Sequence, residues 1–443
     1  MAIKILLPEK VNMIIHTIWA AGFEAYAVGG CVRDSILGRV PDDWDITTSA
    51  KPEDIKKLFK RTIDTGIEHG TVTVMLGKEG FEVTTYRIDG EYEDSRHPKE
   101  VTFTSNLRED LKRRDFTINA MAYNDEVGLV DIFEGILDIE KKVIRCVGNA
   151  KERFTEDALR MMRAVRFSAQ LGYSIDEGTK EAIKELAPTL QKISAERIQV
   201  ELVKLVTSNN PDYLRIAYET GITAQVLPEF DLCMKTEQNN PHHMYSVGEH
   251  TLWAMKYIQA DKVLRLAILF HDMGKPEALT TDEKGIHHFY GHNEISSQIA
   301  REVLRRLRFD NDTIHKVERL VFYHDYRPNL TDKFIRRFVT KIGKELFPFY
   351  LLVQKADAMA QSEYKREEKL HNIETADKIF QGIMEPEECL CLKDLAVTGK
   401  DLIDLGIKPG KEIGEILNKF LEMVIENPEL NQKEILLNNL SKK

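Results

Sequence analysis

The hydrophobic pattern of the chain changes once, near residue 152, and this change limits the possible folds more than any other feature. Before it, short runs rich in β-branched and aromatic residues alternate with helical stretches, as in TVTVMLG (71–77) and FEVTTYRI (81–88). After it, apolar residues recur three and four positions apart to the end of the chain, which is typical of amphipathic helices. The sequence therefore predicts an α+β fold whose sheet is confined to the first third of the chain.

Length and composition set broader limits. A chain of 443 residues is too long for one core, so we expect several domains. Turn-rich stretches predict boundaries that give residues 1–148, 149–235, 236–375 and 376–443. No apolar run approaches the length of a membrane span and no signal-peptide pattern is present, which predicts a cytoplasmic protein with no membrane partner. The five scattered cysteines fit reduced thiols.

The net charge of −10 argues against a general nucleic-acid coat, because phosphate binding needs local positive potential. It leaves open an RNA enzyme with one basic face. Arg160, Arg163 and Arg166 recur at helical spacing and would supply such a face. A solvated helix surface explains the same pattern, so charge alone does not decide between these interpretations.

The stretch AVGGCVRDSILGRVPDDWDITTSA (27–50) carries the first candidate site. Gly29 and Gly30 fall between a predicted strand and a predicted helix, where backbone N–H groups can approach phosphate. Asp43 and Asp45 follow, one residue apart, and on a strand both carboxylates would face the same Mg²⁺ pair. Such a pair can activate a 3′-hydroxyl and stabilise the pyrophosphate leaving group. The alternative is a polar turn beside Pro41, which the upstream glycine turn disfavours.

Further motifs follow in order: DGEYEDSRHPKEVTF (89–103), DLKRRDFTINAMAYN (110–124), GLVDIFEG (128–135), RFTEDALRMMRAVRFSAQLGY (153–173) and SAER (194–197). Together with residues 27–50 they resemble the polymerase-β-like nucleotidyltransferase superfamily, specifically class II tRNA nucleotidyltransferases and bacterial poly(A) polymerases. The resemblance implies a mixed-sheet nucleotidyltransferase head over 1–148 and an all-α neck over 149–235 that selects nucleobases and binds RNA.

The resemblance also implies roles for individual residues. Asp43 and Asp45 would be catalytic metal ligands, and Glu82 a third carboxylate, although a surface strand glutamate fits that position equally well. The implied nucleotide-binding residues are Gly29, Gly30, Arg33, Arg113, Arg114, Asp115, Asp157, Arg160 and Arg163.

Asp157 and Arg160 are expected on one helix face, three residues apart. Taken alone, such a pair is usually a surface ion pair. In the family it resembles a protein template, since a carboxylate accepts from the amino group of cytosine or adenine while a guanidinium donates to the adjacent ring nitrogen. Guanine and uracil reverse both roles.

A second set of motifs comprises YSVGEHTLWAM, LAILFHDMGKP, FYGHNEIS, LVFYHDYRP and KADAMA. It resembles the HD phosphohydrolase superfamily over residues 242–360, within the domain 236–375. The implied metal ligands are His250, His271, Asp272, His292, His324 and Asp357. Mixed imidazole and carboxylate ligands suit divalent transition metals such as Ni²⁺, Mn²⁺ or Fe²⁺, and His242, His243, His287 and His288 are expected to be bystanders.

Residues 394–440, within the last domain (376–443), resemble the helical region with which relatives grip the tRNA elbow, although a packing helix pair fits the same pattern. The sequence therefore predicts an enzyme that adds C, C and A from CTP and ATP to tRNA 3′ ends and has an additional HD phosphodiesterase or phosphatase activity. The alternatives are a CC-adding, A-adding or poly(A)-polymerase relative, or an HD phosphohydrolase with a non-catalytic RNA-binding head. The sequence does not predict an oligomeric state.

Overall fold

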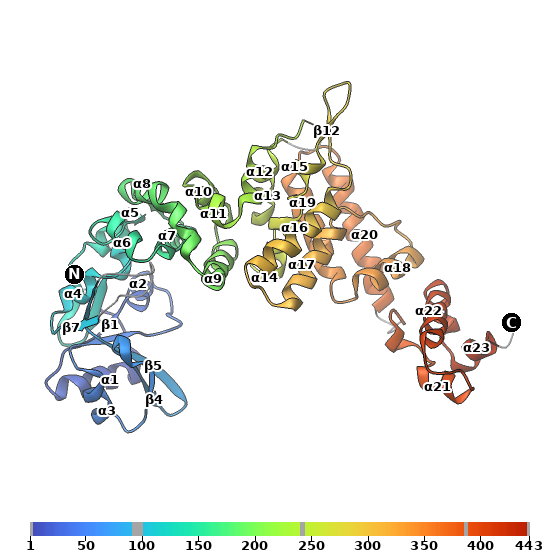
Figure 1. The fold of residues 1–443 in the computed structure, drawn as a ribbon. Coiled ribbons are helices and arrows are strands. Elements are labelled where there is room, and N and C mark those ends of the chain that lie inside the picture. Colours follow the sequence, from blue (N-terminus) through green and yellow to red (C-terminus); the bar gives the residue numbers. More distant parts are fainter. Residues whose placement is uncertain (1–2, 91–100, 240–243, 385–388, 441–443) are drawn as a thin grey trace. The chain divides into compact units, whose positions relative to one another are not determined.

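The computed structural model describes residues 3–90, 101–239, 244–384 and 389–440 (Figure 1). The chain divides into two compact units, Met1–Pro228 and Glu229–Lys443. The α+β class is confirmed, because the first unit carries a mixed sheet and helices make up most of the rest. Among the described helices, none combines the length and apolar character that crossing a membrane requires.

A seven-stranded sheet forms the core of the first unit, in the order β3-β4-β5-β2-β1-β8-β9. Strand β1 lies inside it, antiparallel to both β2 and β8, while β2 runs parallel to β5. All four residues of β1 are buried, as expected for a strand covered on both faces. The strands are β1 (Ala25–Val28), β2 (Ile46–Thr48), β3 (Thr62–Gly66), β4 (Thr71–Leu76), β5 (Glu79–Thr85), β8 (Met121–Asn124) and β9 (Gly128–Asp131).

Helix α1 (Glu9–Ala20) contacts β1. Its buried residues Val11, Ile14, Ile15 and Ile18 recur at the helical period, so one apolar stripe faces the protein. Helix α3 (Pro52–Leu58) lies beside β4. Strands β6 (Arg87–Asp89) and β7 (Val101–Phe103) form a short ladder. Residues 91–100 of the motif DGEYEDSRHPKEVTF, which resembles a flexible loop of the family, lie outside the described residues.

The neck is helical, and its helices α7 and α9 pack against each other. A two-residue parallel ladder, β10 (Val143–Ile144) with β11 (Ser174–Ile175), joins it to the end of the head. The head ends with α4 (Leu107–Lys112), η2 (Thr117–Asn119) and α5 (Gly135–Lys141). The neck helices are α6 (Ala150–Glu156), α7 (Leu159–Leu171), α8 (Glu177–Leu186), α9 (Ala195–Val206), α10 (Leu214–Glu219) and α11 (Ile222–Val226).

The second unit is mainly helical. The expectation of helices alone was wrong here, because a hairpin of β12 (Thr280–Thr281) and β13 (His287–His288) interrupts them. The helices are α12 (Pro228–Lys235), α13 (Val247–Lys256), α14 (Lys262–Phe270), α15 (Lys275–Ala278), α16 (His292–Arg306), α17 (Asn311–Tyr323), α18 (Asp332–Ile342), α19 (Phe347–Ala360) and α20 (Arg366–Met384).

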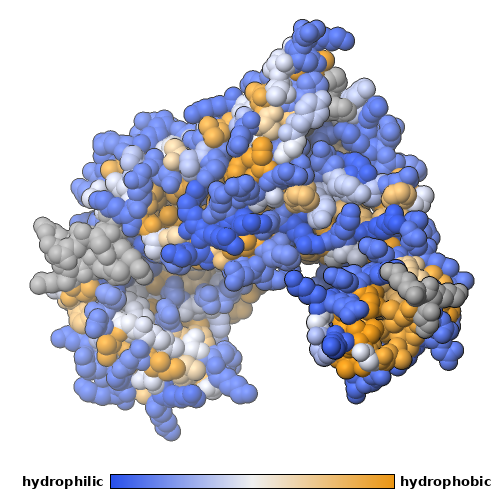
Figure 2. Space-filling view, turned by 45° about the vertical axis from the view of Figure 1, so that its right-hand side comes forward, coloured by the Kyte–Doolittle hydropathy of each residue, from blue (hydrophilic) through white to orange (hydrophobic). Residues whose placement is uncertain are grey.

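The tail of this unit comprises α21 (Gly399–Asp404), α22 (Lys411–Glu426) and α23 (Lys433–Asn438) around an apolar cluster of its own. Phe420 and Val424 of α22 lie in that cluster with Leu402 and Leu436. Apolar residues also reach the surface of the tail helices (Figure 2), where they line a groove of about 560 Å³. The tail therefore forms a small packed body with an apolar face.

Candidate functional site

The first candidate site begins at the glycine turn between β1 and α2 (Gly30–Ile36), as the sequence predicts. Gly29 adopts φ 86° and ψ −132°, a conformation that side chains disfavour. A Cβ placed on Gly29 would lie 3.2 Å from Nη1 of Arg114, so the missing side chain lets this guanidinium lie against the turn. The turn thus places the Arg114 guanidinium close to the backbone of Gly29.

A Gly29→Ala variant is expected to destabilise the turn by about 1–3 kcal/mol and to displace Arg114. We expect its KM for CTP to rise, measured by nucleotide incorporation. Gly38→Ala is the matched control, because Gly38 also has positive φ (69°) but nothing within 4 Å of an added Cβ. Equal KM values in the two variants would contradict a role for the Gly29–Arg114 contact.

Asp43 and Asp45 lie just before β2, which begins at Ile46. The prediction that both lie on a strand was therefore wrong. Asp45 nevertheless extends the pairing, because its carbonyl accepts from Val28 N at 3.0 Å. Ile46 pairs with Val83 in parallel register, which makes Asp45 the neighbour of Glu82. Ile46 and Val83 are buried, so Asp45 and Glu82 share the opposite, exposed side.

The electrostatics of this edge suit a cation. Desolvation raises the pKa of the Asp45 carboxyl; Arg114 partly offsets this, and the nearby Asp43 carboxylate adds to it. Like charges held together in this way are relieved when a divalent cation binds between them. The register therefore brings Asp45 and Glu82 into a donor set that fits Mg²⁺, with Asp43 close by.

Asp110, which the sequence analysis did not single out, holds the arginines beside these carboxylates. It is fully buried, pairs with Arg113 Nη2 at 2.8 Å and Arg114 Nη2 at 3.5 Å, and accepts from Thr47 Oγ1 at 2.9 Å. Burial opposes its charge, but both arginines outweigh this and lower its pKa. Because Thr47 lies two residues beyond Asp45, this network ties the arginines to the carboxylate edge. The spacing i, i+3, i+4 was the available sequence signal.

Asp115 is buried and engaged within the protein. It accepts from Arg163 Nε at 2.9 Å and from Asn119 Nδ2 at 3.1 Å, while Arg33 Nη1 donates to Asn119 Oδ1 at 2.6 Å. Burial opposes the Asp115 charge, yet Arg163 holds its pKa well below the usual range. Asp115 thereby links α2 to α7. The structure places it as an orienting group for Arg163 and Arg33.

The predicted helix through Asp157 and Arg160 is broken. Asp157 has extended geometry (φ −141°, ψ 103°) between α6 and α7, and its Oδ1 accepts from Leu159 N at 3.0 Å. Its Oδ2 accepts from Arg197 Nη2 of α9 at 2.7 Å. Arg160 pairs instead with Glu156, at 2.6 Å, and donates to the Arg113 carbonyl at 2.9 Å. The expectation of one shared helix face is therefore corrected, since Asp157 caps α7.

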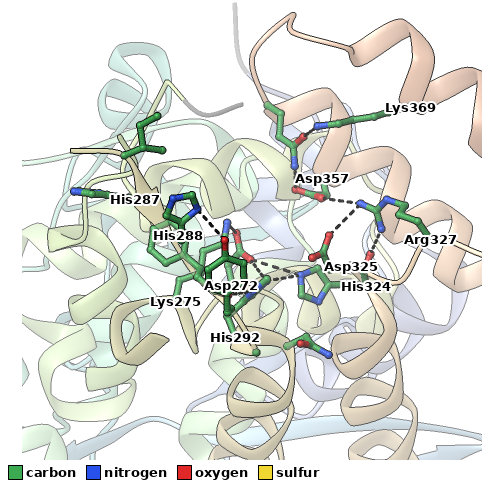
Figure 3. Close-up of a pocket in the computed structure, with 16 residues that line it drawn as sticks. Asp272, Lys275, His287, His288, His292, His324, Asp325, Arg327, Asp357 and Lys369 are labelled. Atoms are coloured by element: carbon green, nitrogen blue, oxygen red, sulfur yellow. Dashed lines mark hydrogen bonds and ion pairs between the residues drawn. The ribbon is translucent and has the colours of Figure 1, made fainter. Parts of the chain in front are cut away.

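The second candidate site lies in the Glu229–Lys443 unit and brings together all six predicted ligands. Figure 3 shows four of them, Asp272, His292, His324 and Asp357. Two metal-capable sets share one carboxylate: His250, His271 and Asp272 form one, and Asp272, His292 and His324 the other. Within each set the ligand atoms lie within 4.8 Å of one another. Asp357 adjoins the first set, because its Oδ1 lies 2.9 Å from His250 Nε2.

The tautomers of these histidines favour a bound cation. Nδ1 of His271, His292 and His324 lies 2.6–2.8 Å from the carbonyls of Ile268, Phe289 and Val321, which can only accept. Each Nδ1 therefore carries a proton, and Nε2 of the neutral ring carries a lone pair. Nε2 of His292 lies 3.2 Å from Nε2 of His324, so a cation bound at this point would be within reach of both rings.

The carboxylates of this cluster stay charged. Burial opposes ionisation of Asp272 and Asp357, but the imidazoles around both, with Lys275 beside Asp272, hold their pKa values well below the ordinary one. Burial lowers the pKa of His271, yet the two carboxylates outweigh it and raise that pKa to about 10. A proton on His271 thus supplies a positive charge that compensates Asp272 and Asp357. A divalent metal bound to the cluster would compensate the same two carboxylates.

A cavity of about 630 Å³ opens over this cluster. Lys275, Arg327 and Lys369 line it, and Lys275 Nζ lies 2.7 Å from Asp272 Oδ2. His288, expected to be a bystander, lines the cavity with His287, although neither belongs to a metal-capable set. His242 and His243 lie outside the described residues. The site therefore combines a cluster of metal-capable residues with three cationic side chains around the cavity. The separate sequence motifs did not reveal this combination.

Comparisons with known proteins agree with this geometry. Three family models match: the poly(A) polymerase head domain over 25–145, the RNA and SrmB-binding site of polymerase A over 172–234, and tRNA nucleotidyltransferase domain 2 over 277–440. The CCA-adding enzyme of Enterococcus faecalis is 36% identical over 97% of this chain and 94% of its own. That of Ligilactobacillus salivarius is 36% identical over 98% and 96%. The crystal structure of the Bacillus stearothermophilus CCA-adding enzyme in complex with CTP matches with a TM-score of 0.74 and 30% identity over 99% of both chains.

A mixed sheet with a glycine turn, edge carboxylates and a helical neck defines a nucleotidyltransferase of the polymerase-β-like class. Relatives that match almost the whole chain narrow this class to enzymes that act on tRNA. The chain belongs to the CCA-adding enzyme family of tRNA nucleotidyltransferases, which confirms the resemblance to nucleotidyltransferases seen in the sequence.

Proposed function

We propose that this enzyme adds C, C and A to tRNA 3′ ends using CTP and ATP. The observation that carries the proposal is the register that sets Asp45 beside Glu82, next to the glycine turn and Arg114. The CTP complex of the B. stearothermophilus relative supports the choice of nucleotide. CC-adding, A-adding and poly(A)-adding chemistry would use the same edge.

Asp43, Asp45 and Glu82 would hold Mg²⁺, which when bound favours ionisation of the attacking 3′-hydroxyl and neutralises the leaving pyrophosphate. The chain itself binds and orients the nucleotide. Asp110 pairs with Arg113 and Arg114. Arg114 lies near Asp45 and the Gly29 turn, and both guanidinium groups can pair with triphosphate oxygens. Backbone N–H groups at the Gly29–Gly30 turn can donate to the same anion.

The test is incorporation on a tRNA transcript that lacks its CCA end, with each nucleotide alone and in combination. Growth by three nucleotides with CTP plus ATP is expected. Growth by two or one would mark a split activity, and a long ATP-dependent ladder would mark a poly(A) polymerase. No growth in any mixture would overturn the proposal.

Base selection by Asp157 and Arg160 remains part of this proposal. We expect Asp157→Asn to weaken preference for CTP and ATP over UTP and GTP by roughly 5- to 150-fold, as one mispaired buried contact costs about 1–3 kcal/mol. Asparagine keeps an oxygen to cap Leu159 N. Asp157→Ala loses both the cap on Leu159 N and the base contact. Comparing it with Asp157→Asn therefore separates the effect of the cap from the effect on base selection. Unchanged base preference in both variants would contradict base selection by Asp157.

A second activity, metal-dependent phosphoester hydrolysis, is favoured by the two ligand sets that share Asp272. Ni²⁺, Mn²⁺ or Fe²⁺ would supply activation of water and charge neutralisation at phosphorus. Lys275, Arg327 and Lys369 can bind and orient the phosphate. No bound transition metal after gentle purification, together with no hydrolysis when Ni²⁺ or Mn²⁺ is added, would overturn this second proposal.

The tail is proposed to contact tRNA, as the resemblance implies. Lys408, before α22, and Lys411, the first residue of α22, are the positive residues that would contact phosphate. Replacing both by Ala is expected to weaken tRNA binding similarly for all tRNA sequences.

A further inference from the structure

The hairpin β12–β13 places an aromatic side chain at the edge of the second cavity. Tyr290 is 79% exposed and lies among the residues that line the cavity. Its ring stacks on His288, with the ring centroids 5.4 Å apart and the planes at 7°. Because most of its surface is exposed, the Tyr290 ring is accessible to a ligand that enters the cavity.

Hydrogen bonds from the same unit fix this pair. His288 Nε2 lies 3.0 Å from Asp282 Oδ2, and Tyr290 Oη lies 3.4 Å from His288 Nδ1. His287, the neighbouring residue, accepts at Nδ1 from Asn239 N at 3.2 Å and pairs in the strand with Thr281. The aromatic pair therefore has a defined orientation before any ligand binds.

The opposite wall of the cavity is positively charged. Figure 3 shows Arg327 and Lys369 on the side away from His287 and His288, with Asp272, His324 and Asp357 between the two walls. Arg327 Nη1 donates to the His324 carbonyl at 2.8 Å, which anchors it beside the metal-capable cluster. A ligand that spans the cavity thus meets cations at one end, the metal-capable residues in the middle and an aromatic face at the other end.

We propose that His288 and Tyr290 form an aromatic subsite that stacks the nucleobase of a nucleoside phosphate whose phosphate lies over the His–Asp cluster. The proposal rests on the proposed phosphohydrolase function and names its substrate class. The cavity volume of about 630 Å³ accommodates a mononucleotide. Stacking is tolerant of base identity, so the subsite selects for a base and not for one particular base.

The test compares AMP with ribose 5-phosphate, which has the same phosphate and sugar but no base, in the Mn²⁺-loaded enzyme. Tyr290→Ala is expected to raise KM for AMP by roughly 5- to 150-fold relative to its effect on ribose 5-phosphate. Tyr290→Trp should restore AMP binding. Tyr257→Ala is the matched control, because Tyr257 is also exposed but does not line the cavity. Equal changes for AMP and ribose 5-phosphate would overturn the subsite.

A binding measurement separates the subsite from the hydrolytic activity. AMP should quench the fluorescence of Tyr290→Trp beyond the quenching seen in the unmodified chain, while ribose 5-phosphate should not. If this quenching occurs but neither compound is hydrolysed, the subsite stands and the phosphohydrolase proposal falls. Without AMP-specific quenching the subsite itself is wrong. Repeating the titration with an oligoribonucleotide that ends in a 3′-phosphate distinguishes an RNA end from a free nucleotide as its source.

Discussion

Replacing Asp43 and Asp45 together by asparagine is expected to reduce nucleotide addition by about 10³-fold or more, since removing even one preorganised charge at a reaction centre costs about 10²–10³. Asparagine preserves side-chain shape, so the backbone hydrogen bond between Val28 and Asp45 should remain. The loss would then report missing negative charge at the edge shared with Glu82. The measurement is the rate of CMP incorporation into tRNA ending before its CCA.

Asp42→Asn is the matched control for this pair. Asp42 is an exposed carboxylate beside Asp43, but it is farther along the chain from the strand pairing that places Asp45 next to Glu82. It should keep most of its activity. If Asp42→Asn is as inactive as the double variant, Asp42 belongs to the metal site and the assignment changes. Hydrolysis at the second site, measured in the same preparations, should be unaffected because that site lies in the other unit.

Replacing Asp272 by asparagine is expected to lower metal affinity at the second site by at least about 100-fold, since loss of even an outer partner of a metal ligand costs about 10- to 100-fold. The effect should be large because Asp272 belongs to both metal-capable sets. One substitution should therefore empty both. Metal content per chain, measured by mass spectrometry after dialysis, checks this directly.

Asp325→Asn controls for charge in the cavity, because Asp325 lines it without belonging to either set. It should retain metal. The Asp272 variant must also be shown to fold, as it loses the 2.7 Å ion pair with Lys275; unchanged CCA addition and helical circular dichroism would show this. Retention of metal by a folded Asp272→Asn protein would contradict the shared-ligand arrangement.

Local sequence patterns predicted what depends on local chemistry. The strand–glycine–helix turn at Gly29 follows from backbone freedom, and the α+β division follows from hydrophobic period. The six His and Asp positions of the second cluster came from resemblance. Their close approach could be anticipated only from the family, because α13, α14, α16, α17 and α19 must pack before the ligands meet.

The failures arose where distant segments decide the outcome. Asp157 looked helical because its neighbours are, yet its carboxylate caps α7 and pairs with Arg197, forty residues away. Asp110 was missed because its importance lies in burial under Arg113 and Arg114, which spacing alone does not show. Tyr290 was missed because it lies in a turn after β13, and its stacking on His288 beside the cavity depends on the folded chain, not on a local pattern.

The ion pair between Asp157 and Arg197 changes what a base must compete with. On the proposed role of Asp157, an incoming cytosine or adenine is weighed against a guanidinium already bound to the carboxylate, not against water. Guanine and uracil present a carbonyl where cytosine and adenine present the amino group, so they offer no donor at that position in exchange for Arg197, and the internal ion pair persists. Discrimination would be an exchange equilibrium within the neck, and salt or an Arg197 substitution would shift it without touching the nucleotide.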